Sequence, residues 1–129
     1  MKGKSLFDRL GGYSAIVTLV DSLVSRLEAD PQLGRFWANR GTDGILREKQ
    51  LLVDFLCKES GGPMYYCGRD MLTTHKGMNI TPEDWQIFLQ YLSLVLDQAS
   101  VDEPERSEVV EFIKGLSDRV VETEIAASA

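Results

Sequence analysis

Residues 66–81, with the sequence YCGRDMLTTHKGMNIT, decide how this chain is interpreted. They contain His75, the only histidine among 129 residues. One imidazole cannot build a histidine-rich zinc site, but it can be the single protein ligand of an iron whose other ligands come from a cofactor. A histidine without such a context is more often an ordinary surface or core residue. The residues around His75 therefore decide between the two interpretations.

Signals that end and begin helices flank this segment. Before it, residues 61–63 read GGP, which interrupts a helix. After it, Thr81 is predicted to be the N-cap of a new helix, with Pro82 at the first helical position and Asp84 as the acid of a capping box. His75 is thus expected near the end of a short segment between two helices.

The string GGP, an aromatic residue, GRDM and then His75 followed by KGMNIT resembles the truncated (2-on-2) haemoglobins, most like group I. The resemblance covers roughly residues 5–97. It implies an all-α fold, a 2-on-2 helical sandwich around haem b, with His75 as the proximal iron ligand. It also implies that the partners are the diatomic gases O₂, CO and NO.

Composition sets outer limits on function. Apolar residues make up 43% of the chain and charged residues 26%, which is typical of one globular domain over residues 1–129, with frayed ends at 1–4 and 125–129. The net charge of −6 disfavours nucleic acid and anionic membranes as partners. No membrane span or signal peptide is recognisable, so we expect a cytoplasmic protein with Cys57 and Cys67 as free thiols.

Apolar residues recur at helical spacing along most of the chain, and no segment shows strand-like alternation. Ser5 is predicted to cap the first helix and Asp102 the last. The helices are predicted at 6–10, 13–29, 45–59, 82–99 and 103–124, with a short turn at 32–37 and a polar loop at 39–44.

A haem is a flat apolar disc, so it needs a slot of aliphatic and aromatic side chains. The candidates for this slot are Leu52, Phe55, Met71, Met78, Ile80, Phe88 and Leu92. The second ring nitrogen of His75 needs an acceptor, and the carbonyl of Met71 or Leu72 lies one helical turn back. The candidates for binding the propionates are Arg69, Lys76 and Lys49, although each is equally an ordinary surface charge.

The resemblance supplies further roles. It implies that an aromatic residue in the corner ADPQLGRFW, residues 29–37, wedges against the haem face, where Phe36 or Trp37 fits and a gap-free count favours Trp37. It also implies that a tyrosine such as Tyr66 covers the haem edge. Phe88 matches a position that faces the distal pocket.

The distal side departs from the family pattern. The position that usually holds a tyrosine matches Val24, with Leu23 beside it. Counted backward from residue 61, the usual glutamine position matches Leu52 and the gate position Glu48. Counted forward from residue 37, the glutamine position is Lys49 or Gln50, because the chain carries about three extra residues. We favour the backward count, since periodicity turns Leu52 inward.

These distal residues lead to several hypotheses. An apolar pocket predicts fast O₂ release, whereas Lys49 or Glu48 would serve as a sixth ligand or donor if either swung inward. The rival functions are a helical interaction or sensor domain without haem, and haem-based NO or peroxidase-like redox chemistry with Glu48 as the acid. No catalytic residues are assigned, and the absence of a flavin or NAD motif means that redox turnover would need an external reductase.

Overall fold

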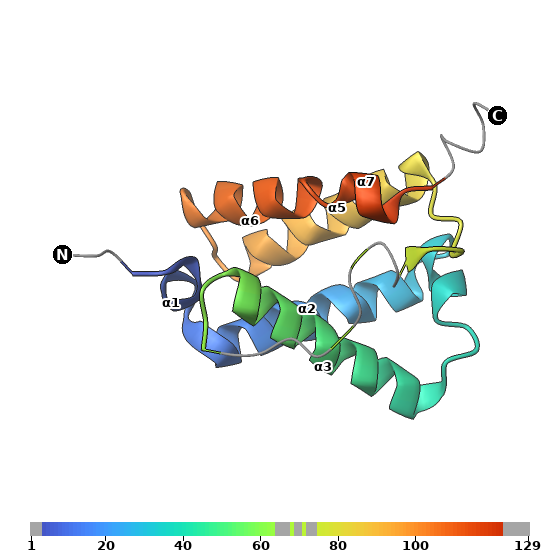
Figure 1. Cartoon of the computed structure of the whole chain (residues 1–129), viewed down its shortest axis with the longest axis horizontal. Helices are drawn as coiled ribbons and strands as arrows, with labels where there is room; N and C mark the ends of the chain where they lie inside the picture. Colours follow the sequence, from blue (N-terminus) through green and yellow to red (C-terminus); the bar gives the residue numbers. More distant parts are fainter. Residues whose placement is uncertain (1–3, 64–67, 69–70, 72–74, 123–129) are drawn as a thin grey trace.

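A computed structural model describes residues 4–63, 68, 71 and 75–122. These residues form two helical layers (Figure 1). One layer contains α2 (Gly12–Ala29) and α3 (Gly41–Glu59), and the other contains α5 (Pro82–Gln98), α6 (Glu105–Lys114) and α7 (Ser117–Val120). No strand occurs in the described part of the chain, as the sequence predicts. None of its helices is long and apolar enough to cross a membrane.

The first helix, α1 (Leu6–Leu10), begins and ends as the sequence predicts. The hydroxyl of Ser5 accepts a hydrogen bond from the N–H of Asp8 at 3.1 Å, which caps the helix N-terminus. Gly11 ends the helix in the left-handed region, with φ of 112°. The chain can therefore turn directly into α2, which begins one residue earlier than predicted.

The predicted turn after α2 is a short 3-10 helix, η1 (Leu33–Phe36). Asp30 holds the turn that leads into it, because one carboxylate oxygen accepts the backbone N–H groups of Gln32 and Leu33 at 2.8 and 2.9 Å. The other oxygen accepts the hydroxyl of Tyr91 at 2.7 Å. Asp30 thus ties the corner between α2 and η1 to α5.

The helix α3 begins four residues earlier than predicted, at Gly41 instead of residue 45. The sequence 39–44 is polar and contains two glycines, which favoured a loop. Gly41, with φ of 72°, turns the chain, and Asp43 then lies in the first helical turn, where its charge favours the helix N-terminus. Gly44 is consequently helical.

The GGP signal ends α3 as predicted. Gly61 has φ of 98° and donates its N–H to Lys58 O at 3.1 Å, while Gly62 donates to Cys57 O at 2.7 Å. This pair of bonds is the Schellman arrangement for a helix C-terminus. Cys57 is buried and free, and its burial raises the pKa of its thiol.

Substitution of Gly62 by alanine is expected to destabilise the protein. A Cβ atom at this position would lie 2.6 Å from Phe7 Cδ1 and 2.9 Å from Cys57 O, so α1 would have to shift away from the end of α3. The expected loss is about 1–3 kcal/mol of unfolding free energy, measured by urea denaturation.

The matched control is Gly44→Ala. A Cβ atom there would meet only Arg40 Cβ, at an ordinary 3.5 Å, inside a helix. Alanine should therefore stabilise α3 by about 0.5–1 kcal/mol. Equal stability of the Gly62→Ala protein and the unmodified chain would contradict the close packing of α1 on residue 62.

The capping box predicted at the start of α5 is present. Asp84 donates its N–H to the Thr81 hydroxyl at 2.9 Å, and its carboxylate accepts the N–H of Thr81 at 2.9 Å. Pro82 occupies the first helical turn. These contacts are set by residues three apart, which is why the sequence could predict them.

The prediction of one last helix over 103–124, capped by Asp102, is wrong. The structure has α6, capped by Pro104, and the separate short helix α7. The break falls at Gly115, the residue type with the lowest helix propensity after proline. Val121 is extended, which takes the chain out of the helix and across to residue 80.

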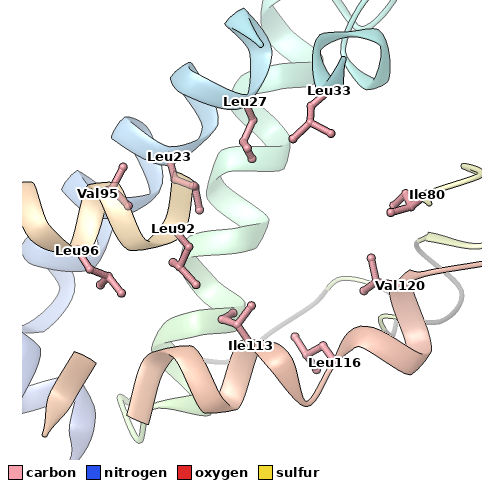
Figure 2. Packing of buried hydrophobic residues seen from close by; sticks show 10 residues of the cluster. All are labelled: Leu23, Leu27, Leu33, Ile80, Leu92, Val95, Leu96, Ile113, Leu116 and Val120. Carbon is pink, nitrogen blue, oxygen red and sulfur yellow. The ribbon is translucent and has the colours of Figure 1, made fainter. Parts of the chain in front are cut away.

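The larger buried cluster lies between the two layers. Figure 2 shows ten of its apolar side chains, which come from α2, η1, α5, α6, α7 and the residues around them. A smaller cluster lies between α1, α2 and α3 and includes Phe7, Val24, Val53 and Cys57. The two clusters are not packed solid, because a cavity lies among their side chains.

Candidate functional site

A cavity of about 840 Å³ opens between the helical layers. Sites for small molecules and cofactors typically have roughly 300–1,000 Å³. Its wall is mainly aliphatic and aromatic, and every side chain drawn in Figure 2 belongs to it. The cavity is therefore large and apolar enough for a flat cofactor.

His75 is part of this wall. Its Nδ1 lies 2.8 Å from the backbone carbonyl oxygen of Met71, the acceptor predicted one turn back. A carbonyl can only accept, so Nδ1 carries the proton. In a neutral imidazole the lone pair is then on Nε2, which is free to bind a metal.

The cavity gathers residues that lie far apart in the sequence. The sequence-predicted residues in its wall are Leu23, Val24, Phe36, Trp37, Glu48, Leu52, Phe55, Met71, His75, Met78, Ile80, Phe88 and Leu92. They come from α2, η1, α3, α5 and the segment around His75. Both aromatic candidates of the 32–37 turn are included, and their rings meet edge to face at 6.3 Å.

Some sequence-predicted residues are not in the described wall. Lys49 is directed to the surface, where its ammonium lies 2.8 Å from a carboxylate oxygen of Asp21. Lys76 is exposed and does not line the cavity. Tyr66 and Arg69 lie outside the described residues.

The register of α3 can be read from its contacts. Leu52 lines the cavity, whereas Gln50 is exposed and donates to the Tyr13 hydroxyl at 3.1 Å. This arrangement supports the backward count over the forward one. Glu48 also lines the cavity, and it forms an ion pair of 2.7 Å with Arg40.

Sequence reasoning missed two cations of the wall, Arg40 and Arg47. Both are exposed, so they lie where the cavity reaches solvent. Treating residues 39–44 as a loop removed Arg40 from consideration. Arg47 lay within the predicted helix 45–59, where its spacing to Leu51 puts both on one face, and it was overlooked.

The wall contains one fully buried charge, Asp84, which is 1% exposed. Its carboxylate accepts hydrogen bonds from Arg35 Nη2 and Gln32 Nε2, each at 2.6 Å. Burial alone would raise the pKa of this carboxyl, but the hydrogen bonds of Arg35, Thr81 and Gln32 outweigh it and hold the pKa at about 2. Asp84 thereby fastens η1, with its two aromatic residues, to the start of α5.

An all-helical sandwich with one histidine in a large apolar cavity defines the class of haem globins. The family model of bacterial-like globins matches residues 5–122. A group 1 truncated haemoglobin of Mycolicibacterium paratuberculosis is 32% identical over 116 residues, which are 90% of this chain and 83% of that relative. A group 1 truncated haemoglobin of Nostoc commune is 35% identical over 88 residues, or 68% and 72% of the two chains.

Solved structures agree with these relatives. The Fe(III) form of truncated haemoglobin from Tetrahymena pyriformis has a TM-score of 0.82 at 25% identity and covers 92% of this chain and 98% of its own. The 2/2 haemoglobin of a Synechococcus species has a TM-score of 0.79 at 28% identity, with 90% and 95% covered. The chain belongs to the bacterial-like globin family, as a group I truncated haemoglobin.

Membership in this family implies a haem cofactor, and the residues of this chain fit one. The apolar cavity accommodates the disc, and the lone pair of His75 Nε2 suits iron. Arg40 and Arg47 supply positive charge at the exposed edge, where carboxylates of the cofactor require it.

Proposed function

We propose that this protein holds a haem b through His75 and binds O₂, CO or NO reversibly beneath a largely apolar distal wall. Bound in the cavity, the haem would supply an iron with one coordination position open to a diatomic gas. The proposal rests above all on His75, whose imidazole lines the cavity with Nδ1 hydrogen-bonded to Met71 O. That bond fixes the ring and leaves Nε2 as the ligand.

The chain's own residues have distinct tasks in this proposal. Met71 and Met78, on either side of His75, would pack against the proximal face, and Trp37 and Phe88 against the disc. The guanidinium groups of Arg40 and Arg47 would bind the propionates. Because Glu48 pairs with Arg40, one cation at this edge is already partly neutralised, so Arg47 should contribute more to propionate binding.

The distal wall explains the expected ligand preference. Val24 and Leu52 offer no hydrogen-bond donor to a ligand, and Lys49 is engaged by Asp21 at 2.8 Å. Without a donor at these two positions, they give O₂ no electrostatic stabilisation over CO. We therefore expect rapid O₂ release and no lysine ligand to the iron.

The rival function as a helical domain without cofactor predicts a slot filled by side chains, and the 840 Å³ cavity argues against it. The deciding experiment is an absorption spectrum of the purified protein with hemin, in the ferric state, after dithionite and under CO. A Soret band that shifts at both steps supports the proposal. A protein that develops no Soret band after hemin is added would exclude it.

Introducing a donor at Leu52 should slow O₂ release. The Leu52→Gln protein places an amide on the cavity wall, where a hydrogen bond in a buried site stabilises the ligand by about 1–3 kcal/mol. The expected effect is an O₂ dissociation rate lower by roughly ten- to a hundredfold, measured by stopped-flow displacement with CO.

The control is Leu52→Met, which has nearly the shape of glutamine and lacks the amide. It should keep the O₂ dissociation rate within about twofold of the unmodified protein, since only packing changes. Equal rates for the glutamine and methionine proteins would show that Leu52 does not face the ligand. Slow release by the unmodified protein would contradict the apolar distal wall itself.

A further inference from the structure

Glu122 makes three hydrogen bonds to the segment that follows His75. One carboxylate oxygen accepts the backbone N–H of Gly77 and the other accepts that of Asn79, each at 2.8 Å. Its own N–H donates to the carbonyl oxygen of Ile80 at 2.9 Å. Glu122 therefore holds the stretch 77–80 through hydrogen bonds to Gly77, Asn79 and Ile80.

The backbone of this stretch is suited to hold an anion. Gly77 and Asn79 both lie in the left-handed region, with φ of 85° and 58°, which asparagine adopts more readily than most other residues with a side chain. Alternating left-handed residues direct successive N–H groups toward one side, a concave arrangement that binds anions. Here the anion is supplied by the chain itself, and the bonds are charge-assisted.

The electrostatics agree with this geometry. The N–H groups of Gly77 and Asn79 lower the pKa of the Glu122 carboxyl, so it is ionised at neutral pH. Glu122 is half-buried, so water screens its interaction with these N–H groups only in part.

The gripped stretch also carries part of the cavity wall. Met78 and Ile80 line the cavity, and Met78 donates its N–H to the carbonyl of His75 at 3.1 Å, which closes a turn on the histidine. On its other side the ring of His75 is held by Met71 O. The carbonyl of Met71 thus holds the ring of His75 on one side, and on the other its backbone is bonded to Met78, within the stretch that Glu122 holds.

We propose that Glu122 is a positioning residue for the proximal side of the haem, an inference that rests on the proposed function. Its carboxylate holds residues 77–80 in one conformation, and the hydrogen bond from Met78 N–H to His75 O connects this stretch to the histidine. A fixed backbone on this side favours a well-oriented bond from Nε2. The end of the chain is thereby coupled to the iron ligand, although no residue beyond α7 touches the cavity within the described chain.

The test replaces the carboxylate by an amide of the same shape, Glu122→Gln. The amide puts an NH₂ group in place of one of the two accepting oxygens, so one of the two backbone N–H groups faces a donor and its hydrogen bond is lost. In the ferrous protein the iron–histidine stretching band should move or broaden in resonance Raman spectra. Haem loss to an excess of apomyoglobin should be faster on the order of tenfold, and the amide protons of Gly77 and Asn79 should exchange faster with solvent.

Two further proteins make the result specific. Glu111→Gln removes the same charge from the exposed face of α6 and should leave the band and the rate of haem loss unchanged. Glu122→Asp keeps the charge on a shorter side chain, so its iron–histidine band and its rate of haem loss should lie between those of the unmodified and the glutamine proteins. It also tests the proposal if the glutamine protein folds poorly.

The outcomes separate the two proposals. An unchanged iron–histidine band in Glu122→Gln, whether or not the unfolding temperature falls, would reduce Glu122 to a structural contact and overturn the inference while leaving the proposed function intact. An unmodified protein that takes up no haem would overturn both. A shifted band in the Glu111→Gln protein would show that net charge, and not the grip on residues 77–80, is responsible.

Discussion

The His75→Ala protein is expected to lose its haem or to hold it without a protein ligand on the iron. His75 is the only histidine in the chain, so no other imidazole can take its place. Lys49 is held by Asp21 at 2.8 Å, and Glu48 is paired with Arg40 at 2.7 Å, so neither is free to substitute. The Soret band should be lost or grossly altered, and binding of CO to the reduced protein should no longer give the spectrum of a histidine-ligated globin.

Chemical rescue can distinguish the loss of the iron ligand from misfolding. The His75→Gly protein leaves room beside Met71 for free imidazole, which should restore the Soret band in a concentration-dependent way. Circular dichroism should show unchanged helix content in both proteins, because His75 is only half-buried. An unaltered haem spectrum in the alanine protein would mean that another group binds the iron and would contradict the assignment of His75.

The second large effect is expected at Asp84. Replacement by alanine removes acceptors for Arg35, Gln32 and the N–H of Thr81 at once. Arg35 is exposed enough to turn to water, but the side-chain half of the α5 capping box and the bond from Gln32 are lost. We expect a loss of about 2–3 kcal/mol of unfolding free energy in urea, and weaker retention of haem as η1 loosens.

A neighbouring acid serves as the control. Glu83 lies in the same first turn of α5 but is exposed, and it contributes only through the helix dipole. Glu83→Ala should therefore cost less than about 1 kcal/mol. Equal losses for the two proteins would mean that the buried network around Asp84 does not hold η1 in place.

The same network predicts how stability depends on pH. The pKa of Asp84 is lowered from 3.8 to about 2 in the folded protein, so its stabilisation is complete above about pH 4 and is lost as the pH falls toward 2. The amount is about 2 kcal/mol. In acid titrations at fixed urea, the difference between the unmodified protein and Asp84→Asn should close within this interval. A stability difference between the two proteins that stays constant from pH 7 to pH 2 would contradict the lowered pKa of Asp84.

The sequence could predict those features of the fold that are made by residues close together in the chain. The caps at Ser5 and Thr81 and the Schellman end after Cys57 were predictable, because each is made by residues three to five apart. The bond from His75 to Met71 O is of the same kind. The early start of α3 was missed because two glycines outweighed the favourable position of Asp43 in the first helical turn.

The residues of the candidate site divide in the same way, into those that local spacing predicts and those that only tertiary contacts place. Leu52 and Phe55 were assigned to the cavity because helical periodicity turns them to one face. The propionate candidates could not be chosen in this way, since every exposed lysine or arginine looks alike in a sequence. The structure instead puts Arg40 and Arg47 at the cavity and Lys49 on Asp21.

By itself, the sequence determined that this chain is an all-α globin with His75 as the ligand candidate, because those features depend on local capping, periodicity and one motif. Only the tertiary structure decided that Glu122 grips Gly77 and Asn79, and that Arg35 meets Asp84. These partners lie about 40 to 50 residues apart. Packing of the helical layers brings such residues together, and nothing in their local spacing distinguishes them from other charged residues on a solvated helix face.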